Sequence, residues 1–240
     1  MISVCIASYN GALYIERQLR SILCQLDQAD EVIVVDDHSS DATLDVVERV
    51  GDSRIKIYRN DSNEGVLRTF ERAIRLACGE IIFLSDQDDI WYPEKVRIYL
   101  QTFDERPEVT LVLSDTKVIN DVDEVVAESF FKSRGGFSPG LIHNITKNKY
   151  LGCTMAFRRP MVDKFLPFPE DIPMHDMWIG CINSIYGTPC FLDMPLMDYR
   201  RHQHNASPAK RQGVLQILAW RWQLVKNLCL KFMALNKILR

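Results

Sequence analysis

Hydrophobic positions in the first hundred residues alternate between short apolar runs and helical spacing. The short runs predict four buried strands, at Ile2–Ala7, Glu31–Asp36, Arg54–Tyr58 and Glu80–Ser85. Apolar residues at three- and four-residue intervals predict helices between them, over about 13–26, 42–50 and 66–77. Strands and helices in this order indicate an α/β fold with a mostly parallel sheet and helices on both faces.

Local signals mark the ends of these elements. Ser39 or Ser40 is placed to cap the second helix, and Gly79 follows the third helix, where a glycine often ends a helix. The pattern then loosens to a strand near Val109–Ser114 and an apolar run over Gly152–Phe157. We therefore expect a mixed second half with longer loops.

Composition excludes some classes of protein. The 240 residues are 47% hydrophobic and 25% charged, which is ordinary for a globular core. The longest uncharged stretch, Met177–Leu192, is shorter than the roughly 20 apolar residues of a membrane-spanning helix. The N-terminus lacks the features of a secretory signal, and seven scattered cysteines show no C-x-x-C pair. We expect a cytoplasmic protein with reduced thiols.

Polar residues cluster where predicted strands end. Ser8, Tyr9 and Asn10 follow the first strand, the segment 36–41 ends the second, and the segment 85–89 ends the fourth. Turns and helix caps explain one acidic strand end. Two such clusters at neighbouring strand ends favour a binding site, because ligands of parallel sheets bind at this edge.

The cluster around Asp86, Asp88 and Asp89 is the densest. Three carboxylates within four positions raise one another's pKa unless a cation or hydrogen-bond donors compensate. Asp86 and Asp88 can converge on one hard cation, and carboxylate oxygens suit Mg²⁺ or Mn²⁺. The alternative is a solvated turn in which Asp89 caps a helix that begins near Pro93.

Four motifs follow one another at these strand ends: Ser8-Tyr9-Asn10, Asp36-Asp37-His38-Ser39-Ser40-Asp41, Asn63-Glu64-Gly65 and Asp86-Gln87-Asp88-Asp89. In this order they resemble the signature of family 2 glycosyltransferases with the GT-A fold. Segments 88–95, 152–159, 175–178 and 199–205 are similar to a branch that contains bacterial rhamnosyltransferases and related surface-polysaccharide enzymes. The resemblance covers residues 1–207 and implies a nucleotide-sugar half (1–115) and an acceptor half (116–207).

The resemblance implies roles on the donor side. Asp37, with Asp36, would accept a hydrogen bond from the N3–H of uracil or thymine, in a pocket lined by Ser8, Tyr9 and Asn10. Asp88 would contact Mn²⁺ or Mg²⁺ directly, and Asp86 would contact the ribose or support the ion. His202 would add a metal or diphosphate contact. The segment from Arg68 to Arg72 stands where many members carry an Arg-Asn pair, so we expect Arg68 or Arg72 at the diphosphate; a solvated helix face is the alternative for either.

On the acceptor side, the resemblance implies that Asp176 is the base of an inverting transfer. The usual acidic neighbour is replaced by His175, for which packing or hydrogen bonding is the more natural role than a second base. The expected sugar or acceptor contacts are His175 itself, Gly152, Cys153, Trp91 and Trp178, and for both tryptophans core packing is an equal alternative. Asp176 as a helix cap is the alternative to the base.

The end of the chain, residues 208–240, has a distinct charge. Nine Lys and Arg and no acid follow Asp198, so residues 199–240 carry +9 and the first 198 residues carry −12 of a net charge of −3. An amphipathic helix is predicted here, with an apolar stripe of Leu215, Leu218, Trp222, Val225, Cys229, Phe232 and Leu239. We expect it to hold the enzyme on the inner face of the plasma membrane, near a glycan or lipid-linked acceptor; packing on the domain or on another subunit is the alternative.

Two other functions compete with an inverting transferase that uses a UDP- or dTDP-linked sugar such as dTDP-rhamnose. A nucleotidyltransferase would need a basic, glycine-rich N-terminal loop, which Ser8-Tyr9-Asn10-Gly11 is not. A non-catalytic nucleotide-sugar-binding module would have no use for both Asp88 and Asp176. We expect no nucleic-acid partner.

Overall fold

The computed structural model describes residues 1–138, 140–202 and 213–238. Within them, the strands are β1 (Ile2–Ser8), β2 (Glu31–Asp36), β3 (Ile55–Arg59), β4 (Ile81–Ser85), β5 (Ile90–Trp91), β6 (Leu111–Ile119), β7 (Val125–Ala127), β8 (Met155–Arg158) and β9 (Pro189–Arg200). The α-helices are α1 (Ile15–Leu23), α2 (Thr43–Val50), α3 (Val66–Leu76), α4 (Lys95–Glu105), α5 (Leu141–Thr146), α6 (Val162–Phe165), α7 (His175–Tyr186) and α8 (Val214–Ile238).

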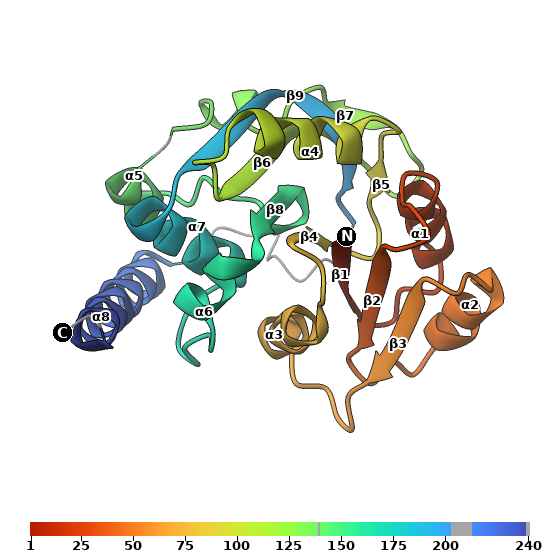
Figure 1. Ribbon diagram of the computed structural model, residues 1–240, viewed down its shortest axis with the longest axis horizontal. Coiled ribbons are helices and arrows are strands. Elements are labelled where there is room, and N and C mark those ends of the chain that lie inside the picture. Colours follow the sequence, from red (N-terminus) through yellow and green to blue (C-terminus); the bar gives the residue numbers. More distant parts are fainter. Residues whose placement is uncertain (139, 203–212, 239–240) are drawn as a thin grey trace.

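These strands form one curled sheet in the order β3-β2-β1-β4-β8-β6-β9-β5, and β7 pairs with β6 (Figure 1). The first four positions are parallel, whereas β8 runs antiparallel to both of its neighbours. The predicted class, a mostly parallel α/β sheet, is confirmed. The expected boundary at residue 115 falls inside β6, so both halves share this sheet, and the boundary at 207/208 lies outside the described residues.

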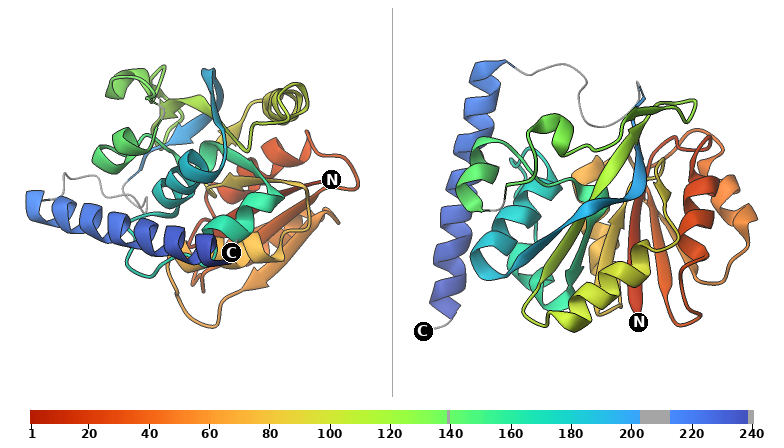
Figure 2. Two further views of the ribbon diagram at one scale, coloured as in Figure 1. Left: turned by 60° about the vertical axis from the view of Figure 1, so that its left-hand side comes forward. Right: turned by 90° about the horizontal axis from the view of Figure 1, so that it is seen from above.

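Both faces of the central strands are buried, as uninterrupted apolar runs require. Successive residues of β1 point to opposite sides: Cys5 packs in the core beneath α3 and α7, and Val4 packs in the core beneath α1 and α4. Figure 2 shows these helices on the two faces of the sheet. Because β1 pairs in parallel with both β2 and β4, the carboxyl ends of these three strands lie side by side at one edge of the sheet.

Two local predictions were wrong. Neither Ser39 nor Ser40 caps α2, because their hydroxyls donate to Asp36 and to Asn10. Asp41 Oδ1 accepts the N–H of Thr43 where α2 begins. Gly79 does not end α3, which passes into extended backbone at Ala77. A Cβ on Gly79 would lie 2.4 Å from the backbone nitrogen of Ser3, so the glycine permits a close approach to β1.

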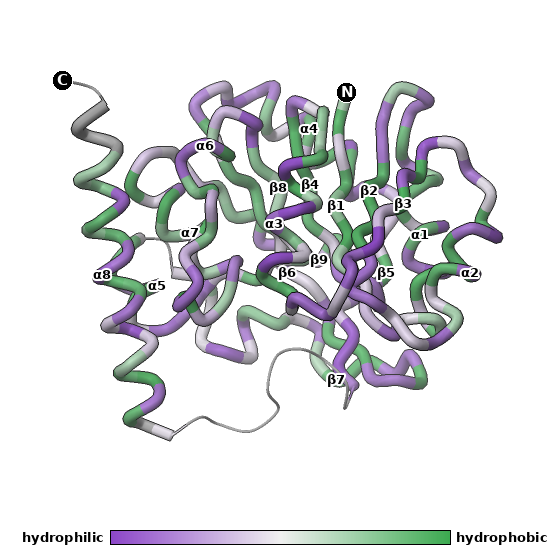
Figure 3. The backbone as a smooth tube through the Cα atoms, turned by 90° about the horizontal axis from the view of Figure 1, so that it is seen from below, coloured by the Kyte–Doolittle hydropathy of each residue, from purple (hydrophilic) through white to green (hydrophobic). Residues whose placement is uncertain are grey.

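Helix α8 stands at the edge of the molecule beside α5 (Figures 1 and 2). Leu224 and Leu228 bury one side of it in the core, and Lys231 Nζ donates to the carbonyl of Leu166. The predicted stripe lies elsewhere: Trp222 is 70% exposed and Leu218 is 59% exposed. Hydrophobic and hydrophilic residues alternate along the whole length of α8 (Figure 3). Leu239 lies outside the described residues, in which no helix combines the length and apolarity of a membrane span.

Candidate active site

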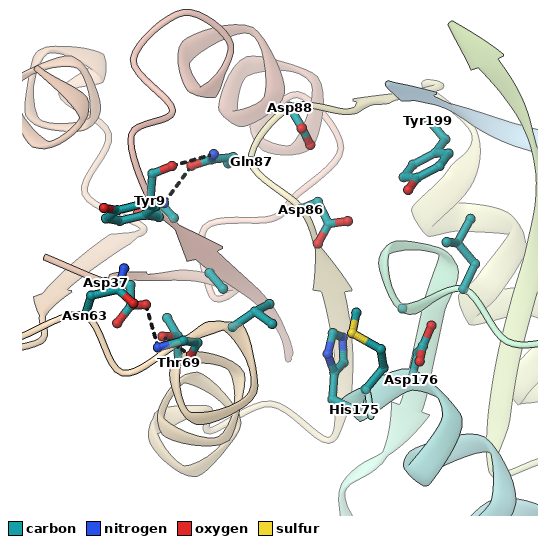
Figure 4. A pocket seen from close by; sticks show the side chains of 17 residues that line it. Tyr9, Asp37, Asn63, Thr69, Asp86, Gln87, Asp88, His175, Asp176 and Tyr199 are labelled. Atoms are coloured by element: carbon teal, nitrogen blue, oxygen red, sulfur yellow. Dashed lines mark hydrogen bonds between the residues drawn. The ribbon is translucent and has the colours of Figure 1, made fainter. Parts of the chain in front are cut away.

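A cavity of about 350 Å³ lies at the carboxyl ends of β1 and β4, bordered by α3, by the start of α7 and by the turn at residues 152–154 (Figure 4). The predicted site residues on its wall are Ser8, Tyr9, Asp37, Asp86, Asp88, Gly152, His175 and Asp176. The other lining residues are Ala7, Asn63, Gly65, Val66, Thr69, Gln87, Leu151, Met174 and Tyr199. Residues far apart in the sequence therefore share one cavity.

Asp37 is held in a fixed orientation at one end of the cavity. Its Oδ1 accepts hydrogen bonds from Asn60 Nδ2 and from the N–H of Glu64, each at 2.8 Å, and its Oδ2 accepts the N–H of Gly65 at 2.9 Å. Gly65 adopts a φ of +83°, a conformation that favours glycine. A carboxylate oxygen has two lone pairs, so Oδ2 retains capacity for one donor from a ligand.

Asp36 organises the loops rather than lining the cavity. It is fully buried, and it accepts hydrogen bonds from the backbone and hydroxyl of Ser39 and from the hydroxyl of Ser8. Asn10 is exposed and accepts the N–H of Ser40 at 2.9 Å. The expected base contacts of Asp36 and Asn10 are thus replaced by contacts that join the loop after β1 to the loop after β2.

Gln87 joins the acidic loop to the loop after β1. The N–H of Tyr9 donates to Gln87 Oε1 at 2.9 Å, and Gln87 Nε2 donates to the Tyr9 carbonyl at 3.0 Å (Figure 4). A Cβ at Gly11 would lie 2.1 Å from Gln87 Oε1, so any larger residue there would displace this amide from the pair. The reciprocal pair fixes the spacing between two walls of the cavity.

Residues at and just after the end of β9 contact Asp88. Its Oδ2 lies 2.6 Å from Nε2 of His202, and its carbonyl accepts a hydrogen bond from Arg200 Nε. Asp89 accepts the N–H of Arg200 and is 1% exposed, so the alternative in which it caps α4 is wrong. Both adjacent carboxylates are therefore positioned by residues more than a hundred positions away.

Burial and mutual repulsion disfavour the ionised form of the clustered carboxylates. Burial, with the neighbouring charges of Asp88 and Asp176, raises the pKa of Asp86 to about 7. Lys95 is fully buried nearby and donates to the carbonyl of Cys153, but its own burial lowers its pKa to about 7. A cation would favour the ionised carboxylates. The residues therefore fit a divalent ion.

The kind of ion follows from the available ligand atoms. Asp86, Asp89 and Cys153 each place one such atom within 4.8 Å of the others. Burial raises the pKa of the Cys153 thiol well above its usual range, and a thiol is a poor ligand. Carboxylate oxygens remain, and they suit Mg²⁺ or Mn²⁺.

Asp176 lies on the opposite side of the cavity from Asp37. It stands in the first turn of α7, and its Oδ1 accepts the N–H of Met177 at 2.5 Å. Met174, not Asp176, is the residue that precedes the helix as its cap. Burial raises the pKa of Asp176 to about 6, so the carboxylate is more basic than an exposed one and still ionised at neutral pH.

Comparison with known proteins identifies the family. The model of glycosyl transferase family 2 matches residues 3–166, about two thirds of the chain. The chain belongs to this family.

Two bacterial glycosyltransferases are similar in sequence to this chain over most of its length. The dTDP-rhamnosyl transferase RfbG of Shigella flexneri is 26% identical, over 92% of this chain and 82% of its own length. The UDP-Glc:alpha-D-GlcNAc-diphosphoundecaprenol beta-1,3-glucosyltransferase WfgD of Escherichia coli is 27% identical, over 79% of this chain and 74% of its own. The chain spans only 66% and 67% of the length of two further relatives, both named uncharacterized glycosyltransferases.

A solved structure shows the same fold. TarS residues 1–349 of S. aureus, in complex with UDP-GlcNAc, superposes with a TM-score of 0.74 at 21% identity, over 96% of this chain and 66% of that one. The fold is therefore the GT-A type that the resemblance implied.

Three predicted contacts of this family 2 chain lie away from the cavity wall. Trp178 is fully buried and donates to the carbonyl of Phe165, and Trp91 is 2% exposed with its ring beside Lys95 Nζ. Neither indole has a face for a sugar, so core packing is the role that the structure supports. Arg68 pairs with Glu71 and Glu170, which removes it from the expected diphosphate contact.

Other predictions stay open or were incomplete. Cys153 is buried behind the wall, and His202 reaches the site through Asp88. His204 and Asn205 of the last motif lie outside the described residues. Sequence reasoning gave no role to Gln87, although it stands between two predicted residues, or to Tyr199, which begins the segment 199–205. It also missed Thr69, whose residue type carries no signal of a site.

Proposed function

We propose that this chain is an inverting, metal-dependent glycosyltransferase that moves a sugar from a UDP- or dTDP-linked donor to a hydroxyl of an acceptor. The observation that supports this most is the order of groups around one cavity. Asp37 stands at one end with an acceptor oxygen, Asp86 and Asp88 lie between, and Asp176 lies on the far side (Figure 4). A nucleotide sugar laid along the cavity would place its nucleoside at Asp37, its diphosphate at Asp86 and Asp88, and its sugar beside Asp176.

The base of the nucleotide binds at Asp37. Uracil and thymine each present an N3–H donor, which Asp37 Oδ2 accepts beside the bond that it receives from Gly65. Ser8 and Tyr9 form the neighbouring wall.

Asp88 and Asp86, with His202 beside Asp88, would hold Mn²⁺ or Mg²⁺. When bound, such an ion neutralises the charge that develops on the departing diphosphate.

Asp176 acts as the general base. The acceptor oxygen forms a bond to the anomeric carbon as the bond from that carbon to the diphosphate oxygen breaks, and the nucleoside diphosphate leaves with the electron pair. The proton of the acceptor hydroxyl passes to the Asp176 carboxylate. Attack opposite the leaving group inverts the anomeric configuration.

The acceptor is a glycan or a lipid-linked glycan of a bacterial surface polysaccharide, and dTDP-rhamnose is one candidate donor. The names of the two relatives, one a dTDP-rhamnosyl transferase and one that acts on a diphosphoundecaprenol acceptor, support these classes. A lipid-linked acceptor places the enzyme at a membrane surface. The exposed apolar residues of α8, such as Leu218 and Trp222, are suited to a peripheral contact there.

Calorimetric titration with UDP, dTDP and GDP, each with and without Mn²⁺, tests the donor site. We expect UDP or dTDP to bind more tightly than GDP, and the preference to need the metal. Tighter binding of GDP would refute the role of Asp37, and binding that is equal without Mn²⁺ would refute the metal site.

A further inference from the structure

His175 is a buried polar residue whose ring has no hydrogen-bonding partner in the part of the chain that the structure describes. Its side chain lines the cavity and is 3% exposed. Among the described residues neither Nδ1 nor Nε2 has a hydrogen-bond partner. A buried polar group without a partner costs free energy, so two such atoms on a cavity wall indicate a ligand that satisfies them.

The ring is fixed by two close neighbours. The ring of Phe70, on α3, lies against it with the centroids 4.3 Å apart. The second neighbour is Gly152, where a Cβ would lie 2.6 Å from His175 Nε2. Gly152 therefore leaves the space that the imidazole occupies, and packing orients both nitrogens without hydrogen bonds from the other described residues.

The imidazole is neutral in this environment. Burial lowers the pKa of His175 to about 4. A neutral imidazole carries one N–H donor and one acceptor nitrogen. A hydroxyl group both donates and accepts and so matches either tautomer, whereas a phosphate oxygen only accepts.

The position of the ring indicates which hydroxyl it meets. Figure 4 shows His175 between Thr69 and Asp176, across the cavity from Asp86. If the proposed function holds, the diphosphate lies at Asp86 and Asp88 and the attacked carbon faces Asp176. The transferred sugar then lies between these groups, beside His175.

We propose that His175 is a specificity-determining residue that hydrogen-bonds a hydroxyl of the transferred sugar, and that Gly152 is the residue that makes room for it. This proposal rests on the proposed function, because it takes the ligand to be a nucleotide sugar. His175 would then be a neutral contact for the sugar on the same cavity wall as the acidic side chains of Asp86, Asp88 and Asp176.

The test compares each nucleotide with its sugar-bearing form. The affinities of UDP and UDP-glucose, and of dTDP and dTDP-rhamnose, are measured by calorimetry in Mn²⁺ for the full chain. For the sugar nucleotide that binds best, His175→Phe lowers the affinity about tenfold, the equivalent of one hydrogen bond, and leaves that of the free nucleotide unchanged. His175→Gln, which keeps a donor and an acceptor, restores part of the loss.

Gly152→Ala supplies an independent variant, because its Cβ displaces the ring without removing the nitrogens. It lowers the same affinity, whereas His143→Phe, at an exposed histidine, does not. An unchanged affinity ratio in both His175→Phe and Gly152→Ala overturns the inference while the proposed function stands. Wild-type protein that binds none of the four nucleotides overturns the proposed function, and the inference with it.

Discussion

Nε2 of His202 lies 2.6 Å from Oδ2 of Asp88, although 114 positions separate the two residues. The ring of His202 also stacks on Tyr14 with centroids 5.1 Å apart, so its position is fixed from two sides. The contact links the loop after β4 to the end of β9. It makes the orientation of the proposed metal ligand depend on the last strand of the sheet.

Replacing His202 therefore weakens metal binding. We expect His202→Ala to lower the affinity for Mn²⁺ about 10- to 100-fold, as is typical when a residue that orients a metal ligand is removed. The measurement is a Mn²⁺ titration of UDP binding by calorimetry. His143→Ala is the matched control, since His143 is exposed on α5. Equal Mn²⁺ dependence in both variants would contradict the role of His202.

The rate of transfer follows the ionisation of Asp176. Burial raises the pKa of Asp176 to about 6, and a general base acts only when deprotonated. The value of kcat/KM therefore rises with pH, reaches half its maximum near pH 6 and is level above that. Hydrolysis of the nucleotide sugar at saturating Mn²⁺, with water in place of the acceptor, provides the profile. A rate that is already maximal well below this pH is incompatible with Asp176 as the base.

Gly79→Ala destabilises the fold without touching the cavity. The new Cβ would lie 2.4 Å from the backbone nitrogen of Ser3, which cannot move aside as a flexible side chain would. We expect a loss of about 1–3 kcal/mol in the free energy of unfolding, measured with urea. Gly213→Ala is the control, because apart from its chain neighbours no described residue has an atom within 4 Å of a Cβ built there. Equal stability of the two variants would show that β1 and the chain at Gly79 are not closely packed.

The two sides of α8 respond differently to mutation. Leu224→Glu places a charge in the core and lowers the free energy of unfolding by about 2–5 kcal/mol, whereas Leu218→Glu, at a 59% exposed position, changes it by less than about 0.5 kcal/mol. Leu218→Glu nevertheless reduces the fraction of protein that sediments with phosphatidylserine vesicles. Undiminished sedimentation of Leu218→Glu rules out this face as the membrane contact.

Much of the nucleotide-binding half is predictable from local patterns. Fully buried strands such as β2 read as uninterrupted apolar runs, and its bounds match the prediction residue for residue. The parallel order then brings Asp37 and Asp86 to one edge, so their presence on one cavity follows from the sequence.

The remaining differences arise from packing, which periodicity does not encode. A tryptophan gives the same sequence pattern whether it lies on a sugar-binding surface or in a core. Only the tertiary contacts show that Trp91 and Trp178 are both buried. Helix α8 has apolar residues on two sides, and the longer stripe around Trp222 was predicted to be its contact face. Leu224 and Leu228, on the other side, are the residues that pack into the core. His175 was expected among the sugar or acceptor contacts, but only the fold shows that both of its nitrogens lack a partner among the described residues.

The most direct test of the account is Mn²⁺-dependent hydrolysis of a panel of UDP- and dTDP-sugars by the wild type, Asp88→Asn and Asp176→Asn. We predict activity with at least one sugar nucleotide in the wild type, a loss of at least about a hundredfold in Asp176→Asn, and a comparable loss in Asp88→Asn that is accompanied by weaker Mn²⁺ binding. Hydrolysis at the wild-type rate in both variants would contradict the proposed mechanism.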